Sequence, residues 1–316
     1  MITSPWVQES IAGSDRTTSL LVSGKLGKIF ESPGSLPVIV CWIGDGFGGD
    51  SPDGADLVIG SDDIVDVTAT IERNPLAATT LAVLLRSSVD ATVASGLAQE
   101  SAAYSMLQAG PEFEAWRATA TRSAHAVDIN VPAESQPTVA IERRDDTLVI
   151  TLDRPHRHNA ITTRMRDELC DALAIAVADD SIREVLLRGN GPSFCSGGDL
   201  DEFGSRPDPA TAHITRLAQS PARLLHLLRD RVTVEIHGAT LGGGIEMAAF
   251  AHRVIARRDT TIGLPEVGIG LIPGAGGTVS MPRRIGRQRT AALALTNRRI
   301  DAETALSWGL VDEIVD

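Results

Sequence analysis

The pattern of hydrophobic and polar positions divides the chain into two parts. In the first part, the apolar run 35–43 predicts a buried strand, and residues 54–72 include one further possible strand. From Asn74 onward apolar residues recur at helical spacing, with a proline in the first turn, which predicts a helix there. Two more helices are predicted, over residues 89–108 and 111–121. This part therefore combines a few strands with a run of helices.

A linker is predicted at residues 125–137, which contain two prolines, and the pattern changes beyond it. Residues 138–142 and 147–152 alternate like the strands of a hairpin whose turn is Arg143 to Asp146. Helices and strands then alternate to the end of the chain. The further helices are predicted at 162–178, around 213–228 and from 243, and the further strands at 184–188, 232–236 and 253–256. This order predicts an α/β fold with functional loops at strand ends.

Composition limits the kinds of partner. A chain of 316 residues with 43% hydrophobic content can bury one large core or two ordinary ones. The net charge of −12 argues against nucleic acid and anionic membranes as partners. Three scattered cysteines favour a reducing compartment over a disulfide framework. No apolar run reaches membrane-spanning length, and the N-terminal residues lack a signal-peptide profile, so we expect a soluble, cytoplasmic protein.

Three glycine-rich segments carry the candidate chemistry, at residues 193–200, 237–246 and 264–278. Glycine lets the backbone approach a ligand closely because no Cβ intervenes. Two such loops can direct two N–H groups at one point, which is what an oxyanion hole requires. Glu246 and Glu266 each follow a glycine or proline turn in these segments. Paired carboxyl groups beside an oxyanion hole suit acid–base chemistry next to a carbonyl.

From about Thr138 to Asp316 the chain resembles the enoyl-CoA hydratase/isomerase (crotonase) superfamily. Four motifs in the same order carry the resemblance: Asp153-Arg-Pro with Asn159-Ala160, Phe194-Cys-Ser-Gly-Gly-Asp199, Gly238-Ala-Thr-Leu-Gly-Gly-Gly-Ile-Glu246, and Pro265-Glu266 with Ile272-Pro-Gly-Ala-Gly-Gly-Thr278. The resemblance implies a spiral of β-β-α units covered by a helical lid. It also implies acyl-CoA substrates and a homotrimer or a hexamer.

The same resemblance implies roles for particular residues. The amides of Gly198 and Gly243 would hold the thioester oxygen, Glu246 would activate water, and Glu266 would transfer a proton to Cα. The substrate-binding residues it implies are Gly198, Asp199, Leu200, Asp201, Gly243, Asn159 and Ala160. Arg154 and Arg157 are candidates for meeting the CoA phosphates. No metal is implied, and no cofactor other than the coenzyme A of the substrate.

The lid is the point at which the chain departs from the family pattern. Family members continue past a strand like 309–315 into helices that cover the acyl-CoA site. In this chain, residues 74–82 and 95–116 resemble those helices but precede the core. We predict a permutation-like arrangement in which region 1–137 supplies the lid of a catalytic core at 138–316. The alternative is an unrelated helical appendage.

Three functions remain as hypotheses. Retention of both glutamates favours an enoyl-CoA hydratase, a carbon–oxygen lyase. A Δ3-Δ2 enoyl-CoA isomerase is the alternative in the same class, since a single base at the position of Glu266 is enough for it. A catalytically weak scaffold that binds a partner is the alternative in a different class. Cys195, beside the first glycine motif, is interpreted as a small buried apolar residue rather than a nucleophile.

Overall fold

The computed structural model describes residues 18–22, 34, 37–44, 54–88, 90–120, 136–204 and 208–316. The predicted linker at 125–137 lies almost entirely outside these residues. Within the described ranges, no helix has both the length and the apolarity needed to cross a bilayer.

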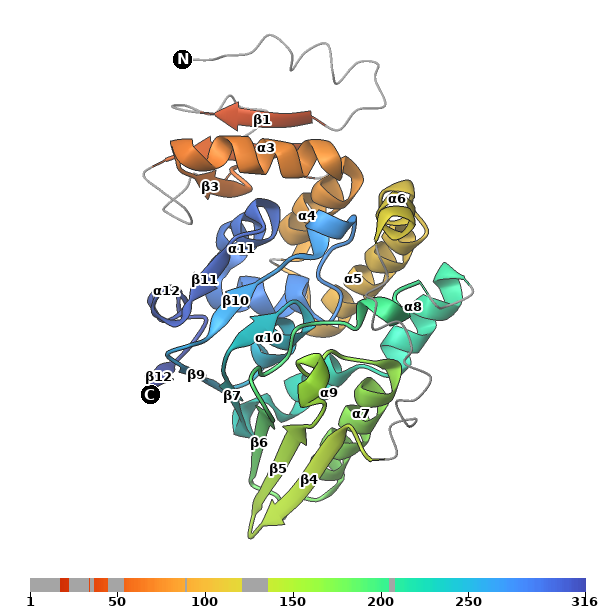
Figure 1. The fold of residues 1–316 in the computed structure, drawn as a ribbon, viewed down its shortest axis with the longest axis vertical. Helices are drawn as coiled ribbons and strands as arrows, with labels where there is room; N and C mark the ends of the chain where they lie inside the picture. The colour runs from red at the N-terminus through yellow and green to blue at the C-terminus, as the bar shows by residue number, and fades with distance from the viewer. Residues whose placement is uncertain are drawn as a thin grey trace.

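A six-stranded sheet forms the base of the second part, with strand order β12-β9-β7-β6-β5-β4 (Figure 1). Its strands are β4 (Val139–Arg144), β5 (Thr147–Leu152), β6 (Glu184–Gly189), β7 (Val232–Ile236), β9 (Arg253–Arg257) and β12 (Glu313–Val315). The pairs are parallel except for the predicted antiparallel hairpin of β4 and β5. The hairpin turn is tighter than predicted, because Asp145 adopts a φ of 54° and lets both strands extend to it.

A smaller sheet lies beside the first, with strand order β11-β10-β8. It consists of β8 (Ala239–Leu241), β10 (Thr261–Gly263) and β11 (Arg299–Asp301). A strand of the large sheet, a short strand of the small sheet and a helix follow one another twice: β7, β8 and α10 (Gly243–Ala248), then β9, β10 and α11 (Gly277–Thr296). The predicted α/β class is therefore confirmed, and β-β-α units recur along the chain.

The helices of this part are α7 (Thr163–Ala178), α8 (Pro209–Ala218), α9 (Pro221–Leu228) and α12 (Ala302–Trp308), together with α10 and α11. Helices were predicted at the positions of α7, α8, α9 and α10 but not at those of α11 and α12. Side-chain caps fix several of these starts. The hydroxyl of Thr162 accepts a hydrogen bond from the amide of Met165, and that of Ser220 accepts one from the amide of Arg223. The helices predicted around 213–228 are thus α8 and α9, and the cap at Ser220 marks where the second begins.

The described residues of the first part form a small parallel sheet and four helices. The sheet has the order β1-β2-β3, formed by β1 (Thr18–Val22), β2 (Val38–Ile43) and β3 (Leu57–Ile59). The helices are α3 (Ile64–Arg73), α4 (Pro75–Ser88), α5 (Val93–Gln108) and α6 (Pro111–Thr119). Helix α3 was not predicted, since within it only Val67 and Ile71 are buried and its apolar pattern is thin. Helix α5 begins later than predicted because the Thr92 hydroxyl caps it.

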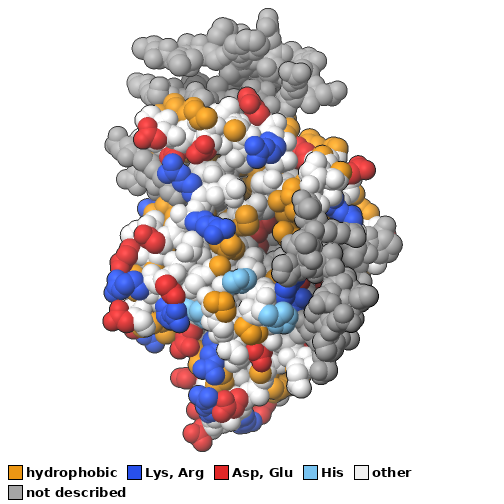
Figure 2. All heavy atoms as spheres, viewed as in Figure 1, with side chains coloured by type: hydrophobic (Ala, Val, Ile, Leu, Met, Phe, Trp, Pro, Cys, Tyr) orange, Lys and Arg blue, Asp and Glu red, His pale blue; other side chains and the backbone are white. Residues whose placement is uncertain are grey.

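The two parts of the chain share one hydrophobic core. Helix α4 packs against α11, and α5 packs against α8 and α11, so residues remote in sequence lie side by side (Figure 1). The buried Asn74 side chain donates a hydrogen bond to the Val267 carbonyl at 2.8 Å. Figure 2 shows acidic and basic side chains interspersed over one face of the molecule. The described helices of the first part, α3 to α6, are therefore packed onto the core rather than held apart from it.

A buried ion cluster joins the first sheet to helices of both parts. Asp56 is 2% exposed and accepts hydrogen bonds from Arg86 at 2.8 and 2.5 Å and from the Val40 amide at 2.8 Å. Arg287 of α11 reaches the same carboxylate at 3.5 Å and donates to the Ala55 carbonyl at 2.8 Å. Removing one member of such a cluster leaves buried charge uncompensated.

We predict that Asp56→Ala lowers the free energy of unfolding by about 3–5 kcal/mol, because two arginines lose their shared carboxylate. Asp62→Ala is the matched control, since Asp62 is exposed, and it should change stability by less than about 0.5 kcal/mol. Urea unfolding measures both. Equal effects of the two substitutions would contradict the importance assigned to the cluster.

Candidate active site

One cavity brings together most of the residues predicted to carry chemistry. Gly198, Asp199, Gly243, Glu246 and Glu266 all line it. These residues come from the loop after β6, the start of α10 and the 3-10 turn at Glu266–Ile269. The remaining predicted binding residues, Leu200, Asp201, Asn159 and Ala160, are not among the residues that line this cavity.

The amides of Gly198 and Gly243 are available to a ligand. Around Gly198, the Ile161 amide donates to the Gly197 carbonyl and the Asp199 amide donates to the Ile161 carbonyl, so the loop is fixed on both sides. Gly243 is the first residue of α10, where a helix amide has no partner within the helix. In the described part of the chain, neither the Gly198 amide nor the Gly243 amide donates a hydrogen bond. Two unpaired donors therefore border one cavity.

Asn159 connects the loops around the site through its side chain. Its side chain is fully buried. Its Oδ1 accepts from the Arg154 amide at 2.7 Å, and its Nδ2 donates to the carbonyls of Asn190, Ser193 and Phe194 at 2.9–3.1 Å. With all its hydrogen-bonding groups used inside the protein, Asn159 holds together the loops that lead to Gly198. Its side chain is thus fully used within the protein, and the predicted contact of Asn159 with the substrate stays a prediction.

The two arginines considered for the CoA phosphates are paired within the protein. Arg154 contacts the buried carboxylate of Asp199 at 2.7 Å and the Ala160 carbonyl at 3.2 Å. Arg157 contacts Asp199 at 3.3 Å and Asp201 at 2.5 Å. Burial alone would raise the pKa of Asp199, but the hydrogen bonds from Arg154 and from the Asp201 amide outweigh it and lower the pKa. Asp199 thus holds the first glycine loop in place.

Glu246 is a buried carboxyl group on α10, 1% exposed. Its Oε2 accepts hydrogen bonds from the amides of Ala275 and Gly277 at 2.6 and 2.8 Å. Burial and the nearby charges of Glu266 and Glu100 raise its pKa well above the ordinary value, and the two amides offset only part of this. Its Oε1 accepts no hydrogen bond from the described residues, so this oxygen is left for a ligand or a water molecule.

Glu266 lies against Gly242 of the second glycine motif. A side chain at Gly242, which has a φ of 47°, would place its Cβ 2.1 Å from Glu266 Oε1, so only glycine fits there. Oε2 of Glu266 is buried without a hydrogen-bond partner. Burial, together with the charge of Glu100, raises the pKa of Glu266 to about 8. Glu246 and Glu266 therefore form a coupled pair that keeps at least one proton at neutral pH.

The cavity is also lined by polar residues that the sequence did not indicate as site residues, among them Glu100 and Tyr104 of α5 and Arg216 of α8. Arg216 stacks over the Tyr104 ring at 4.7 Å from its centroid. The sequence does contain one signal for Glu100. It lies three residues after the buried Leu97 and four before Tyr104, so it occupies the buried face of a helix, where an acidic residue is unusual.

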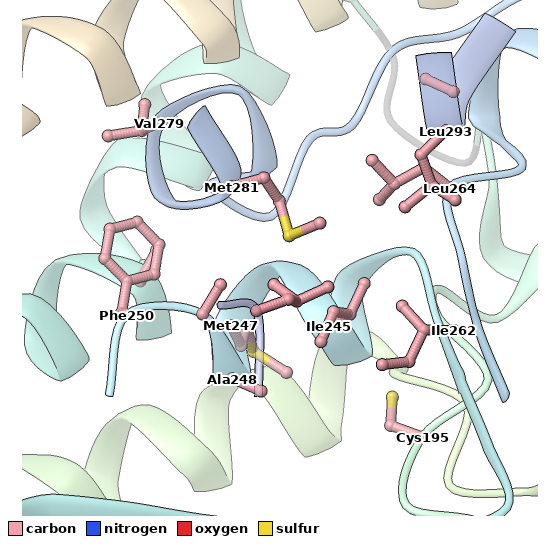
Figure 3. Close-up of a cluster of buried hydrophobic side chains, with 14 of the residues drawn as sticks. Cys195, Ile245, Met247, Ala248, Phe250, Ile262, Leu264, Val279, Met281 and Leu293 are labelled. Atoms are coloured by element: carbon pink, nitrogen blue, oxygen red, sulfur yellow. The ribbon is translucent and has the colours of Figure 1, made fainter. Parts of the chain in front are cut away.

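Cys195 belongs to the packing around α10. Figure 3 shows it near Ile262 in the apolar cluster that contains Ile245 and Met247 of α10 and Met281 of α11. Burial raises the pKa of its thiol to about 12, so it is not a thiolate at neutral pH. The interpretation of Cys195 as a buried apolar residue is confirmed. This cluster holds α10, and with it Gly243 and Glu246, in place.

Comparison with known proteins gives one consistent result. Residues 142–316 match the protein family described as Enoyl-CoA hydratase/isomerase. Putative enoyl-CoA hydratase/isomerase YngF of Bacillus subtilis is 36% identical over 173 residues, which are 54% of this chain and 66% of that protein. The 2,3-dehydroadipyl-CoA hydratase of Escherichia coli is 33% identical over 55% of this chain and 68% of its own length. The chain thus spans about two thirds of these relatives.

Solved structures agree with this assignment. The enoyl-CoA hydratase of Thermoplasma volcanium is 36% identical with a TM-score of 0.52, over 58% of this chain and 74% of the other. A putative enoyl-CoA hydratase/isomerase of Mycobacterium abscessus is 38% identical with a TM-score of 0.52, over 56% of this chain and 70% of the other. The chain belongs to the enoyl-CoA hydratase/isomerase family and has the crotonase fold.

Proposed function

We propose that this protein is an enoyl-CoA hydratase that adds water across the 2,3 double bond of an enoyl-CoA thioester. One observation carries the proposal: two unpaired amides, of Gly198 and Gly243, and two carboxyl groups, of Glu246 and Glu266, line the same cavity. Negative charge develops on the thioester oxygen when the β carbon is attacked. Each amide at that oxygen stabilises the transition state by about 3 kcal/mol.

The two carboxyl groups divide the proton transfers. We place the shared proton on Glu266, because two amides donate to Glu246 and favour its ionised form, whereas Oε2 of Glu266 has no partner. Ionised Glu246, fixed through Oε2, then uses Oε1 to take a proton from water as the water oxygen bonds to Cβ. Protonated Glu266 gives its proton to Cα, and the thioester enolate collapses to the carbonyl. The net change is the addition of one water molecule, and a proton then passes from Glu246 to Glu266. The raised pKa values support a pair that keeps one proton at neutral pH.

Isomerisation remains the alternative reaction in the same cavity. One relative, 1,2-epoxyphenylacetyl-CoA isomerase of Escherichia coli, is 35% identical over 54% of this chain. A single base at Glu266 could move a proton between two carbons without Glu246. The presence of a second carboxyl group with a free oxygen favours water activation and hence the hydratase. A scaffold without catalytic activity has no need for three raised carboxyl pKa values in one cavity.

We further propose that helices α4 to α6 act as the lid that covers the acyl-CoA site. Helix α5 supplies Leu97, Glu100, Ser101 and Tyr104 to the cavity, which supports this assignment. A homotrimer or a hexamer, with acyl-CoA as its substrate and no cofactor of its own, remains the expectation for the whole protein.

Hydration of crotonyl-CoA, followed as the loss of enoyl-thioester absorbance, tests the proposal. We expect wild-type turnover and a decrease of about 10²–10⁴-fold in kcat for Glu246→Gln and for Glu266→Gln, because each removes a proton-transfer group but keeps the side-chain shape. Glu303→Gln, at an exposed carboxylate far along the chain on α12, is the matched control and should behave as wild type.

Two outcomes would contradict the hydratase assignment. Double-bond migration that survives Glu246→Gln but not Glu266→Gln would indicate an isomerase. Absence of turnover in the wild type with any enoyl-CoA, with no change in either variant, would indicate a scaffold.

A matched pair of variants at Gly243 tests the oxyanion hole. The first position of a helix tolerates proline, so Gly243→Pro removes the amide donor, and we expect kcat to fall by about 10²–10³-fold. Gly243→Ala keeps the donor, although its Cβ lies 3.1 Å from Ile161 Cδ1 and 3.3 Å from Ala275 Cβ, and should keep most activity. Equal losses in two equally folded variants would show that the amide is not used.

The pH dependence of stability tests the protonation state of Glu266. Its pKa rises from about 4.5 in the unfolded chain to about 8 in the fold. The stabilisation from holding this proton is complete below pH 4.5 and is lost as the pH rises through 8. Between pH 5 and pH 8.5 the melting temperature of Glu266→Gln should therefore fall by less than that of the wild type. A parallel pH dependence in both proteins would contradict the raised pKa.

A further inference from the structure

Residues 273–278, which we call the amide loop, lie between two buried glutamates. The amides of Ala275 and Gly277 donate to Glu246 at 2.6 and 2.8 Å. The amides that alternate with them, of Gly276 and Thr278, donate to Glu100 at 2.7 and 2.8 Å. Four successive amides are thus shared between two carboxyl groups on opposite sides of the loop.

This alternation depends on glycine. Gly276 adopts a φ of 103°, and a Cβ there would lie 2.4 Å from the ring of Phe250. A Cβ on Gly277 would lie 2.5 Å from Glu246 Cγ. The backbone can therefore turn its amides to both sides only because neither residue carries a side chain.

Glu100 holds its side of the loop through acceptor contacts. It is 2% exposed, and its Oε2 also accepts from the Thr278 hydroxyl at 2.7 Å. Among the described residues, no arginine, lysine or histidine forms an ion pair with it. The hydrogen bonds that stabilise its ionised form come from Gly276 and Thr278, so the loop and Glu100 stabilise each other.

We propose that Glu100 is a positioning residue of the reaction. By fixing the amides of Gly276 and Thr278, it holds those of Ala275 and Gly277 on Glu246 Oε2, and thus directs Oε1 of Glu246 toward the attacking water. This inference rests on the proposed hydration chemistry and extends it to a helix that precedes the core in the chain.

The charge of Glu100 also acts on the proton-transfer groups. The titratable groups that face it are Glu246 of α10, Glu266, Tyr104 of its own helix and Arg216 of α8. Burial raises the pKa of Glu100 itself to about 7, although the hydrogen bonds from Thr278 and Gly276 and the charge of Arg216 oppose this. In its ionised form Glu100 raises the pKa of both Glu246 and Glu266. Removing the charge at Glu100 should therefore lower both pKa values and move both limbs of the activity–pH profile to lower pH.

The test compares Glu100→Gln with Glu114→Gln, a control at an exposed glutamate of the neighbouring helix α6. In crotonyl-CoA hydration we expect Glu100→Gln to lower kcat by about 10²-fold, the effect of a catalytic group displaced by about 1 Å. KM should change by less than about threefold, because the contacts to the substrate remain. Glu114→Gln should match wild type in kcat and pH profile.

If Glu100 only fastens α5 to α11, Glu100→Gln lowers the melting temperature but leaves kcat per folded molecule and the pH profile unchanged. That result overturns the proposal. A decrease in kcat without a shift of the profile toward lower pH overturns the electrostatic part of it.

Two further measurements do not depend on turnover. They therefore distinguish a failure of the proposed function from a failure of the inference about Glu100. Amide hydrogen exchange over residues 273–278 should become faster in Glu100→Gln and stay unchanged in Glu114→Gln. An infrared titration of the carboxyl groups should show the Glu246 and Glu266 protons lost at lower pH in Glu100→Gln. Unchanged exchange and titration would overturn the inference even in a protein that hydrates no substrate.

Discussion

The site depends on the burial of a carboxyl group, Glu246, inside a hydrophobic core. Taking a carboxylate out of water costs several kcal/mol unless donors inside the protein replace the water. Glu246 faces this cost on α10, a helix surrounded by apolar side chains. The replacement donors are main-chain amides of the amide loop, and they can reach the carboxylate only because the loop passes within contact distance of it. The burial of Glu246 therefore requires both the apolar packing around α10 and the path of the amide loop.

This constraint reaches across the whole chain. Two of the four amides of the loop donate hydrogen bonds to Glu246, and the other two also need acceptors because they are buried. Glu100 of α5 accepts the hydrogen bonds of these two amides. Helix α5 precedes the six-stranded sheet in the sequence, but its residues line the cavity in the folded protein. Covering a site requires only that a helix lie over it, whatever its order in the chain. The solved relatives match about 58% of this chain, and the helices that bear on Glu246 from the first part lie before the matched region 142–316.

The features that could be predicted from the sequence are those that local chemistry determines. Glycine is needed where backbone and carboxyl group come within contact distance, so the three glycine-rich segments indicated where Gly198, Gly243, Glu246 and Glu266 would meet. The strands of the large sheet followed from their apolar pattern. Helix α3 and the break between α8 and α9 did not, because a few buried residues and one capping serine determine them.

Residues whose role depends on distant partners were not predictable. Arg154 and Arg157 resemble free cations in the sequence and turn out to be paired with Asp199. Asn159 is buried because three loops converge on its amide group. Glu100 is one acid in an alanine-rich helix, and only the fold brings the amide loop to it.

The most direct test of the account is a structure of the protein with a bound, unreactive enoyl-CoA analogue. The account predicts that the thioester oxygen accepts hydrogen bonds from the amides of both Gly198 and Gly243 at about 2.7–3.1 Å, with the β carbon facing Glu246 Oε1. A thioester oxygen that lies beyond reach of both amides would contradict it.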